Sequence, residues 1–183
     1  MTWDWRVGPA AAALRRGAVI AHATEAVIGL AALARNAAGA RRIRELKRRP
    51  RDKSFIVVAA STLQLAGLVS LEVPLRAEID ASWPGPHTWI LPAARFAPRW
   101  LVSKNDDIAV RVTAHPQMSA LCRLAGPIVS TSANPSGRRP ARSQFQVRRY
   151  FGGGVDHYLA GTLGGAARPT SIRDGRSGRV LRA

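Results

Sequence analysis

Six short apolar segments, separated by stretches that suit helices and turns, restrict this 183-residue chain to few architectures. They cover residues 18–24, 27–33, 54–60, 87–91, 107–113 and 127–133. Each is short and is bounded by Gly, Pro or polar residues, a pattern typical of buried strands. Helical patterns alternate with the earlier segments, whereas the later strands come closer together. The sequence therefore predicts an α/β fold with a mixed sheet rather than a purely parallel one.

Proline, glycine and asparagine mark the ends of the predicted helices. Pro9 and Gly17 bound the first helix, and Pro116 and Gly126 bound a later one. Asn36 is expected to cap a helix that ends near residue 48. Further helices are expected after a Ser61 cap, over residues 74–82 and around residues 144–151.

Basic residues strongly outnumber acidic ones. The chain has 28 Lys and Arg against 11 Asp and Glu, which gives a formal net charge of +17, and 46% of its residues are apolar. This excess favours a polyanionic partner, nucleotide or nucleic acid; the alternative is an Arg-rich composition that makes every surface basic. The length and apolar content predict that residues 1–183 form a single domain with a sizeable core.

The cysteine and the charge pattern indicate a cytoplasmic protein. Cys122 is the only cysteine, which excludes an internal disulfide and fits a reducing compartment. The four His are dispersed without metal-ligand spacing, so no protein-bound metal site is expected. Polar residues interrupt the uncharged stretch 55–71, which is therefore not expected to span a membrane. The charge order at the N-terminus is the reverse of that in a signal peptide.

A basic segment, residues 45–54, leaves a predicted helix and enters an apolar strand. It carries Lys47, Arg49 and Lys53, and thus two of only three lysines in a chain with 25 arginines. A lysine retained in such a chain indicates a site that needs a compact ammonium, and fixed cations suit a triphosphate. The alternative is that these cations complement the dipole of the helix end, with Glu45 paired to an arginine four residues away.

Polar side chains also stand at the ends of predicted strands. Residues 130–134 carry three hydroxyls and an amide, which suit a phosphate or carboxylate, or alternatively cap a local turn. Arg111 shares its strand face with small residues, which suits bidentate capture of a carboxylate. The alternative for Arg111 is an ion pair with Asp106 or Asp107. Thr24 ends its segment where α/β proteins place ligands.

Six motifs, taken together and in order, resemble those of the YrdC/TsaC family of threonylcarbamoyl-AMP synthases, in its short single-domain bacterial form. They are Ala23-Thr-Glu-Ala-Val-Ile-Gly-Leu30, Lys47-x-Arg49 with Asp52-Lys53, Trp83-Pro-Gly-Pro-x-Thr88, Ala109-Val-Arg-Val-Thr113, Ser130-Thr-Ser-Ala-Asn-x-Ser-Gly137 and Pro169-Thr-Ser-Ile-Arg-Asp174. The chain departs from the family pattern at three positions. Ala23 and Ser54 stand where proline is common, and Ile28 stands where the family has an aromatic residue.

The resemblance implies a twisted, open sheet flanked by helices, with a basic concave face. It also implies the synthesis of threonylcarbamoyl-AMP and pyrophosphate from L-threonine, bicarbonate and ATP, for tRNA modification. The residues that it implies are Lys47, Arg49 and Lys53 as catalytic cations, Arg49, Lys53, Ser132 and Asn134 for ATP, and Thr24, Arg111, Ser130 and Thr131 for threonine.

This chemistry needs few protein groups. A carbamate oxygen of carboxylated threonine attacks the α-phosphorus as pyrophosphate leaves, so oriented cations and donors suffice, with Mg²⁺ carried on the phosphates of ATP. We expect tRNA or other RNA on the basic face, and other tRNA-modification proteins as partners. The main alternative is a non-catalytic RNA-binding or ribosome-maturation factor that uses the same concave face. A related carbamoyl-adenylate domain is a third possibility, usual in much longer chains.

Overall fold

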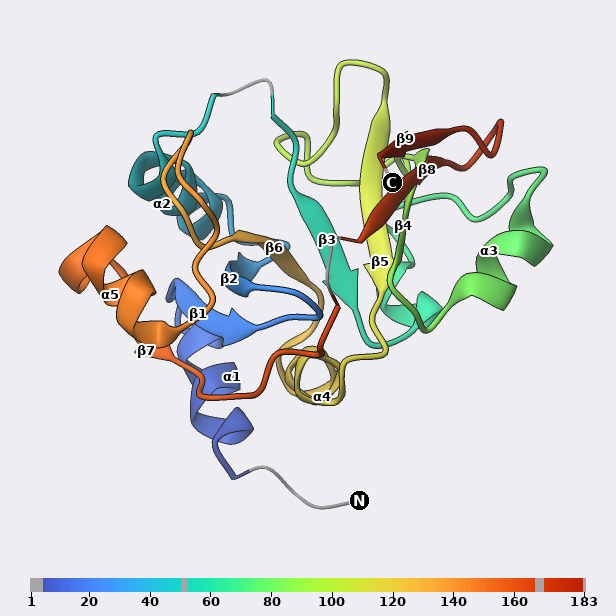
Figure 1. Cartoon of the computed structure of the whole chain (residues 1–183). Coiled ribbons are helices and arrows are strands. Elements are labelled where there is room, and N and C mark those ends of the chain that lie inside the picture. The colour runs from blue at the N-terminus through green and yellow to red at the C-terminus, as the bar shows by residue number, and fades with distance from the viewer. Residues whose placement is uncertain (1–4, 51–52, 167–169, 183) are drawn as a thin grey trace.

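The computed structural model describes residues 5–50, 53–166 and 170–182, and the described chain forms one nine-stranded sheet with helices around it (Figure 1). The strands are β1 (Ile20–Ala23), β2 (Ile28–Leu33), β3 (Ile56–Ala59), β4 (His87–Pro92), β5 (Asp107–Val112), β6 (Ile128–Ser132), β7 (His157–Tyr158), β8 (Ser171–Asp174) and β9 (Val180–Arg182). The quoted motif residues Asp52 and Pro169 lie outside the described ranges. All six apolar segments contain a strand, which confirms the predicted α/β class.

The strand order is β7-β1-β2-β6-β3-β5-β4-β8-β9, and the sheet is mixed. The pairs β1–β7, β3–β5 and β4–β8 are parallel, whereas the other five neighbouring pairs are antiparallel. The late strand β6 lies between β2 and β3, and the C-terminal hairpin β8–β9 extends the sheet beside β4 (Figure 1). Segments far apart in the sequence therefore meet at the centre of the sheet.

The helices begin and end close to the predicted signals. They are α1 (Val7–Arg15), α2 (Ala37–Lys47), α3 (Arg76–Ser82), α4 (Pro116–Ala125) and α5 (Gln144–Phe151), with short 3₁₀ helices η1 (Thr62–Leu65) and η2 (Gly152–Gly154). The Asn36 side chain accepts a hydrogen bond from the Gly39 amide at 3.0 Å, as predicted. Gly126 has a φ of 95° directly after α4, where a residue with a side chain would be strained.

The prediction that Ser61 caps a helix is wrong. The turn that follows is the 3₁₀ helix η1, and the Ser61 side chain makes no capping hydrogen bond. The Gln64 side-chain oxygen accepts from the Ala60 amide at 2.9 Å, and its amide donates to the Cys122 carbonyl at 2.7 Å. Gln64 in this turn thus connects the residue after β3 to α4.

Different helices pack on the two faces of the sheet. The side chains of Val57, Val110 and Val112 belong to the larger core cluster, into which α2, α3 and α5 also pack. On the other face, α1 and α4 cover Val58 and its neighbours in a smaller cluster and leave the sheet open toward β5 and β8. This uncovered part of the sheet positions the site. Among the described residues, none of the helices is long and apolar enough to cross a membrane.

Candidate active site

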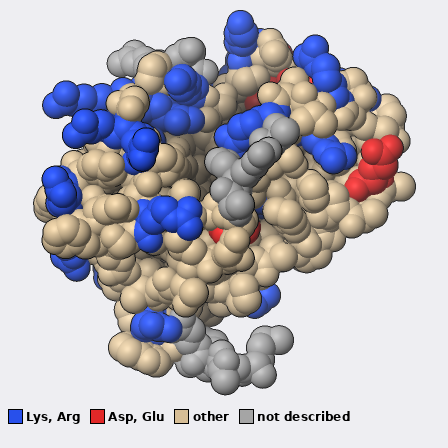
Figure 2. Space-filling view, viewed as in Figure 1, with Lys and Arg blue, Asp and Glu red and all other residues tan. Residues whose placement is uncertain are grey.

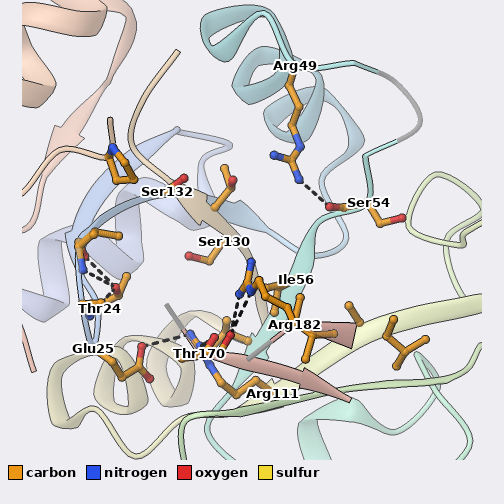
Figure 3. Close-up of a pocket in the computed structure, with 18 residues that line it drawn as sticks. Thr24, Glu25, Arg49, Ser54, Ile56, Arg111, Ser130, Ser132, Thr170 and Arg182 are labelled. Atoms are coloured by element: carbon orange, nitrogen blue, oxygen red, sulfur yellow. Dashed lines mark hydrogen bonds and ion pairs between the residues drawn. The ribbon is translucent and has the colours of Figure 1, made fainter. Parts of the chain in front are cut away.

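A cavity of about 360 Å³ opens on the uncovered face of the sheet. Its lining comes from the β1–β2 turn, the connection between α2 and β3, the sheet strands, the loop after β6 and the two ends of the β8–β9 hairpin (Figure 3). The lining residues are Thr24, Glu25, Ala26, Val27, Arg49, Ser54, Ile56, Val58, Ile90, Ala109, Arg111, Ser130, Thr131, Ser132, Pro140, Thr170, Ile172 and Arg182. Figure 2 shows Lys and Arg side chains on both sides of the hollow on this face. The cavity therefore combines an apolar floor with hydroxyls and guanidinium groups.

Strand register explains the floor of the cavity. Ile56 on β3 pairs with Ser130 on β6 and with Ala109 on β5, so the three side chains stand in one row across the sheet. The next row on this face contains Val58 and its partner Arg111. The alternation predicted for residues 107–113 is thus confirmed, because Ile108, Val110 and Val112 lie in the core while Arg111 lines the cavity.

Arg111 is buried in the cavity wall, with an exposed fraction of only 5% for the whole residue. Its Nη1 donates to the Thr170 hydroxyl at 2.8 Å, and its Nη2 lies 3.3 Å from the Glu25 carboxylate. Its Nε has no partner among the described residues. Burial lowers the pKa of Arg111, while attraction to Glu25 opposes this shift. The Arg111 guanidinium is therefore incompletely hydrogen-bonded in the wall of the cavity.

The alternative ion pair between Arg111 and Asp106 or Asp107 does not form in the described structure. Asp107 instead accepts from Arg176 at 2.7 Å. Glu25, whose other carboxylate oxygen accepts from the Thr113 hydroxyl at 2.9 Å, is the acidic partner of Arg111. A partly buried carboxylate thus binds one edge of the guanidinium.

Ser130, Thr131 and Ser132 all line the cavity at the end of β6, but Asn134 does not. The Ser132 hydroxyl donates to the Asn134 side-chain oxygen at 2.6 Å, and the Asn134 amide donates to the Arg138 carbonyl at 2.7 Å. The polar groups of Asn134 therefore shape the loop after β6, which is the turn-capping alternative considered for this segment.

Lys47 lies behind the cavity rather than in its lining. Its side chain is buried, and its ammonium donates to the backbone carbonyls of Ser132 and Asn134, the latter at 2.6 Å. Burial, with the charge of Arg49 nearby, lowers the pKa of Lys47 to about 8, so the ammonium is still mostly protonated at pH 7. Lys47 therefore fastens the end of α2 to the end of β6.

The other two predicted cations differ in position. Arg49 lines the cavity, and its Nη2 donates to the Ser54 carbonyl at 2.8 Å (Figure 3). The Arg49 guanidinium also lies 5.5 Å from the centre of the Phe55 ring. Lys53 is exposed and is not part of the lining, although its carbonyl accepts from Arg44 at 3.0 Å. Of the three predicted cations, only Arg49 is thus part of the described cavity lining.

Thr24 borders the cavity, but its hydroxyl serves the turn between β1 and β2. The hydroxyl donates to the Val27 carbonyl at 2.7 Å and accepts from the Val27 amide at 3.3 Å. Thr24 thus stabilises the β1–β2 turn, which places Glu25 at the edge of the cavity.

Sequence reasoning missed four polar lining residues: Glu25, Ser54, Thr170 and Arg182. Arg182 donates to the Thr170 carbonyl at 2.7 Å, while the Thr170 hydroxyl accepts from Arg111. Glu25 and Thr170 lie inside two of the six family motifs, so their position in these motifs could have identified them. No local sequence pattern indicates a site role for Arg182. Among the described residues, no group of three His, Cys, Asp or Glu is placed to hold a metal ion.

Comparisons with known proteins agree with this architecture. The model of the Sua5/YciO/YrdC family, described as "Telomere recombination", matches residues 12–183. A threonylcarbamoyl-AMP synthase from Halorhodospira halophila is 54% identical over 186 residues, covering 99% of this chain and 96% of the relative. The one from Nitrosococcus oceani is 48% identical, covering 98% of each.

Solved structures share the fold. P. abyssi Sua5 in complex with L-threonine superposes with a TM-score of 0.86 at 34% identity, covering 95% of this chain. This chain spans 52% of that longer protein. E. coli YciO has a TM-score of 0.82 at 23% identity, with 96% of this chain and 87% of YciO covered, and supports the fold alone. The chain belongs to the Sua5/YciO/YrdC family.

Proposed function

We propose that this chain catalyses the formation of threonylcarbamoyl-AMP and pyrophosphate from L-threonine, bicarbonate and ATP. Near full-length relatives at about half identity carry that enzyme's name, and a related Sua5 has been solved with L-threonine. The observation in this chain that best supports the proposal is the buried Arg111, which lines a cavity together with an acidic side chain and a hydroxyl-rich strand end, and whose Nε has no hydrogen-bond partner among the described residues. These enzyme relatives favour catalysis over a non-catalytic RNA-binding role.

Arg111 is the proposed anchor for the threonine carboxylate. Its Nη2 becomes available when the substrate carboxylate takes over from Glu25, whose contact is long at 3.3 Å. Thr24, Ser130 and Thr131 border the same part of the cavity. This subsite fixes one end of the amino acid, so that the carbamate formed on its nitrogen is held toward ATP.

The proposed ATP subsite lies at the opposite rim, where Arg49 and Ser132 line the cavity and Lys53 stands exposed beside it. Arg49 and Lys53 would neutralise phosphate charge that grows as pyrophosphate leaves. Lys47 and Asn134 support this subsite by holding the backbone of the Ser132 loop.

Mg²⁺ is proposed to enter on the phosphates of ATP. Glu25 is the one carboxylate in the described lining, and it is already bound to Arg111 and Thr113, so the lining suits an ion that brings its own phosphate ligands. Such an ion would add further positive charge at the leaving pyrophosphate.

The basic rim around the cavity is the proposed contact surface for tRNA or other RNA, and other tRNA-modification proteins are the proposed receivers of the product. A cytoplasmic location follows from this role. Phosphate contacts with such a rim would give affinity without base specificity.

Pyrophosphate release by the purified protein tests the proposal. With ATP and bicarbonate present, release is expected to depend on L-threonine and to fall to background when threonine is omitted. Equal release without threonine would refute a threonylcarbamoyl-AMP synthase and leave only ATP hydrolysis.

A further inference from the structure

A buried histidine lies directly behind the cavity wall. His22 on β1 has an exposed fraction of 1%, and its two ring nitrogens have different partners. Nδ1 lies 3.0 Å from the Ala23 carbonyl, and Nε2 lies 3.2 Å from the Ser130 hydroxyl oxygen. A carbonyl oxygen can only accept, so Nδ1 carries the hydrogen. In the neutral ring, Nε2 is then an acceptor, and the Ser130 hydroxyl must donate to it.

The surroundings of His22 keep its ring neutral near pH 7. Burial lowers its pKa to about 4, and the groups His115 and Arg111 act in the same direction. The Ala23 carbonyl and the Glu25 carboxylate act in the opposite direction without overcoming burial. The donor and acceptor roles therefore stay fixed over the physiological range.

The absence of a side chain at Gly29 allows the contact between His22 and Ser130. Gly29 lies on β2 between the two residues, and it is the cross-strand neighbour of His22. A Cβ at this position would stand 3.0 Å from His22 Nε2 and 3.1 Å from the Ser130 hydroxyl oxygen. The glycine therefore allows a side chain of β1 to reach a cavity-lining side chain of β6 across the strand between them.

We infer that His22 is a positioning residue that turns the Ser130 hydroxyl into a hydrogen-bond acceptor for the amino-acid substrate; this rests on the proposed function. Ser130 lies among the side chains that line the cavity (Figure 3), and because its hydrogen points to His22, it presents only lone pairs to that cavity. A carboxylate or an ionised phosphate has no hydrogen to donate there and is disfavoured. The ammonium and the side-chain hydroxyl of threonine are the matching donors.

Arg111 and Ser130 therefore bind different groups of the substrate. Arg111 attracts the carboxylate, whereas Ser130 accepts from an N–H or O–H elsewhere on the same molecule. An amino acid that entered in the reverse orientation would set its carboxylate against lone pairs and its ammonium against a guanidinium. The His22–Ser130 pair thus contributes to orientation as well as to affinity.

The test compares two substitutions of His22 by calorimetric titration with L-threonine and by steady-state kinetics. His22→Phe keeps a buried ring but removes the acceptor, and we expect about tenfold weaker threonine binding with an unchanged KM for ATP. His22→Gln can place an amide oxygen near the position of Nε2, and we expect it to restore most of the affinity. If the Phe variant does not fold, His22→Met against His22→Gln supplies the same comparison.

A double-mutant cycle with Ser130→Ala separates positioning from general packing. In the Ser130→Ala background, His22→Phe is expected to leave threonine affinity unchanged, because the hydroxyl that it orients is gone. Fully additive losses, equal losses for threonine and ATP, or a Gln variant that is no better than Phe at equal melting temperature would overturn the inference.

Titration with L-2-aminobutyrate identifies the donor. If the threonine hydroxyl donates to Ser130, Ser130→Ala loses the preference for threonine over 2-aminobutyrate; if the ammonium donates, binding of both weakens equally. Unchanged affinity for both would overturn the inference. Failure of the wild-type protein to bind threonine would instead refute the proposed function, before any variant is considered.

Discussion

Arg111 lies in the cavity wall with its guanidinium held by Thr170 on one edge and by Glu25 on another. Both charges of the Arg111–Glu25 pair are nearly buried, with side-chain exposures of 6% and 13%. Removing one partner of such a pair leaves an uncompensated charge, which costs far more than losing an exposed pair. Stability and substrate binding are therefore linked at this residue, and a single substitution cannot separate them.

A pair of substitutions separates them. Arg111→Met should lower the free energy of unfolding by about 3 kcal/mol, because the Glu25 carboxylate is left without its cation. Adding Glu25→Gln should recover most of that loss but none of the threonine binding. Urea unfolding and calorimetric titration measure the two effects. Recovery of threonine binding in the double variant would contradict the role proposed for Arg111.

Lys47 gives a second prediction at this scale. Lys47→Met keeps the aliphatic stem but leaves the buried Ser132 and Asn134 carbonyls without their donor, so the free energy of unfolding should fall by about 3 kcal/mol. Lys104→Met, at an exposed position, is the control and should stay within about 0.5 kcal/mol. Denaturant unfolding measures both. An unchanged Lys47→Met protein would mean that the ammonium does not fasten this loop.

Individual residues were predictable from sequence only where a local pattern exposes their environment. Strand alternation placed Arg111 on the cavity face correctly, because period two is a property of the strand itself. Its partner Glu25 was not predictable from pattern, since the two meet only through the sheet. Lys47 and Lys53 look alike in sequence, yet one is buried behind the site and the other is exposed, and only tertiary packing decides between them.

Among the elements, the segment from residue 160 to 166 holds the β1–β2 turn, which carries the acidic lining residue Glu25. The Gly164 amide donates to the Thr24 carbonyl at 3.0 Å, and the Ala166 amide donates to the Glu25 carbonyl at 2.9 Å. α4 holds the start of the same segment, because the Gln117 amide donates to the Ala160 carbonyl at 2.7 Å. The segment thus ties the β1–β2 turn to α4 and positions Glu25.

Gly164→Ala tests this element. The added Cβ would stand 3.0 Å from the Glu25 Cα, so the turn must shift, and we expect a loss of about 1–2 kcal/mol together with a higher KM for threonine. Gly153→Ala, where a Cβ would meet nothing within 4 Å, is the matched control and should change neither quantity. Thermal unfolding and kinetics read out both. Identical behaviour of the two variants would show that the segment does not position Glu25.

Element types were more predictable than their arrangement. Caps and stops such as Asn36 and Gly126 act within a few residues, so helix ends were foreseeable. The predicted Ser61 cap was wrong. The hydrogen bond from Gln64 to the distant helix α4 was not foreseen either, because no local pattern reveals it. The insertion of β6 between β2 and β3 was likewise not predictable, since strand order depends on contacts between segments remote in sequence.

At the scale of the whole molecule, the sheet presents an uncovered face where the two helices of one layer stop short. Cations, hydroxyls and one carboxylate from the turn, the central strands and the C-terminal hairpin meet there. The net charge of +17 gives this face a field that favours anionic substrates. That residues 1–183 form a single domain stays a prediction, as does RNA binding at the rim.

The most direct measurement follows labelled carbon from bicarbonate into the nucleotide product. With ATP, L-threonine and ¹³C-bicarbonate, mass spectrometry should find one labelled carbon in an adduct of threonine and AMP, formed in step with pyrophosphate. The adduct should be absent without threonine and strongly reduced in Arg111→Met. Release of pyrophosphate with no labelled adduct, or a labelled product that forms without threonine, would contradict the account.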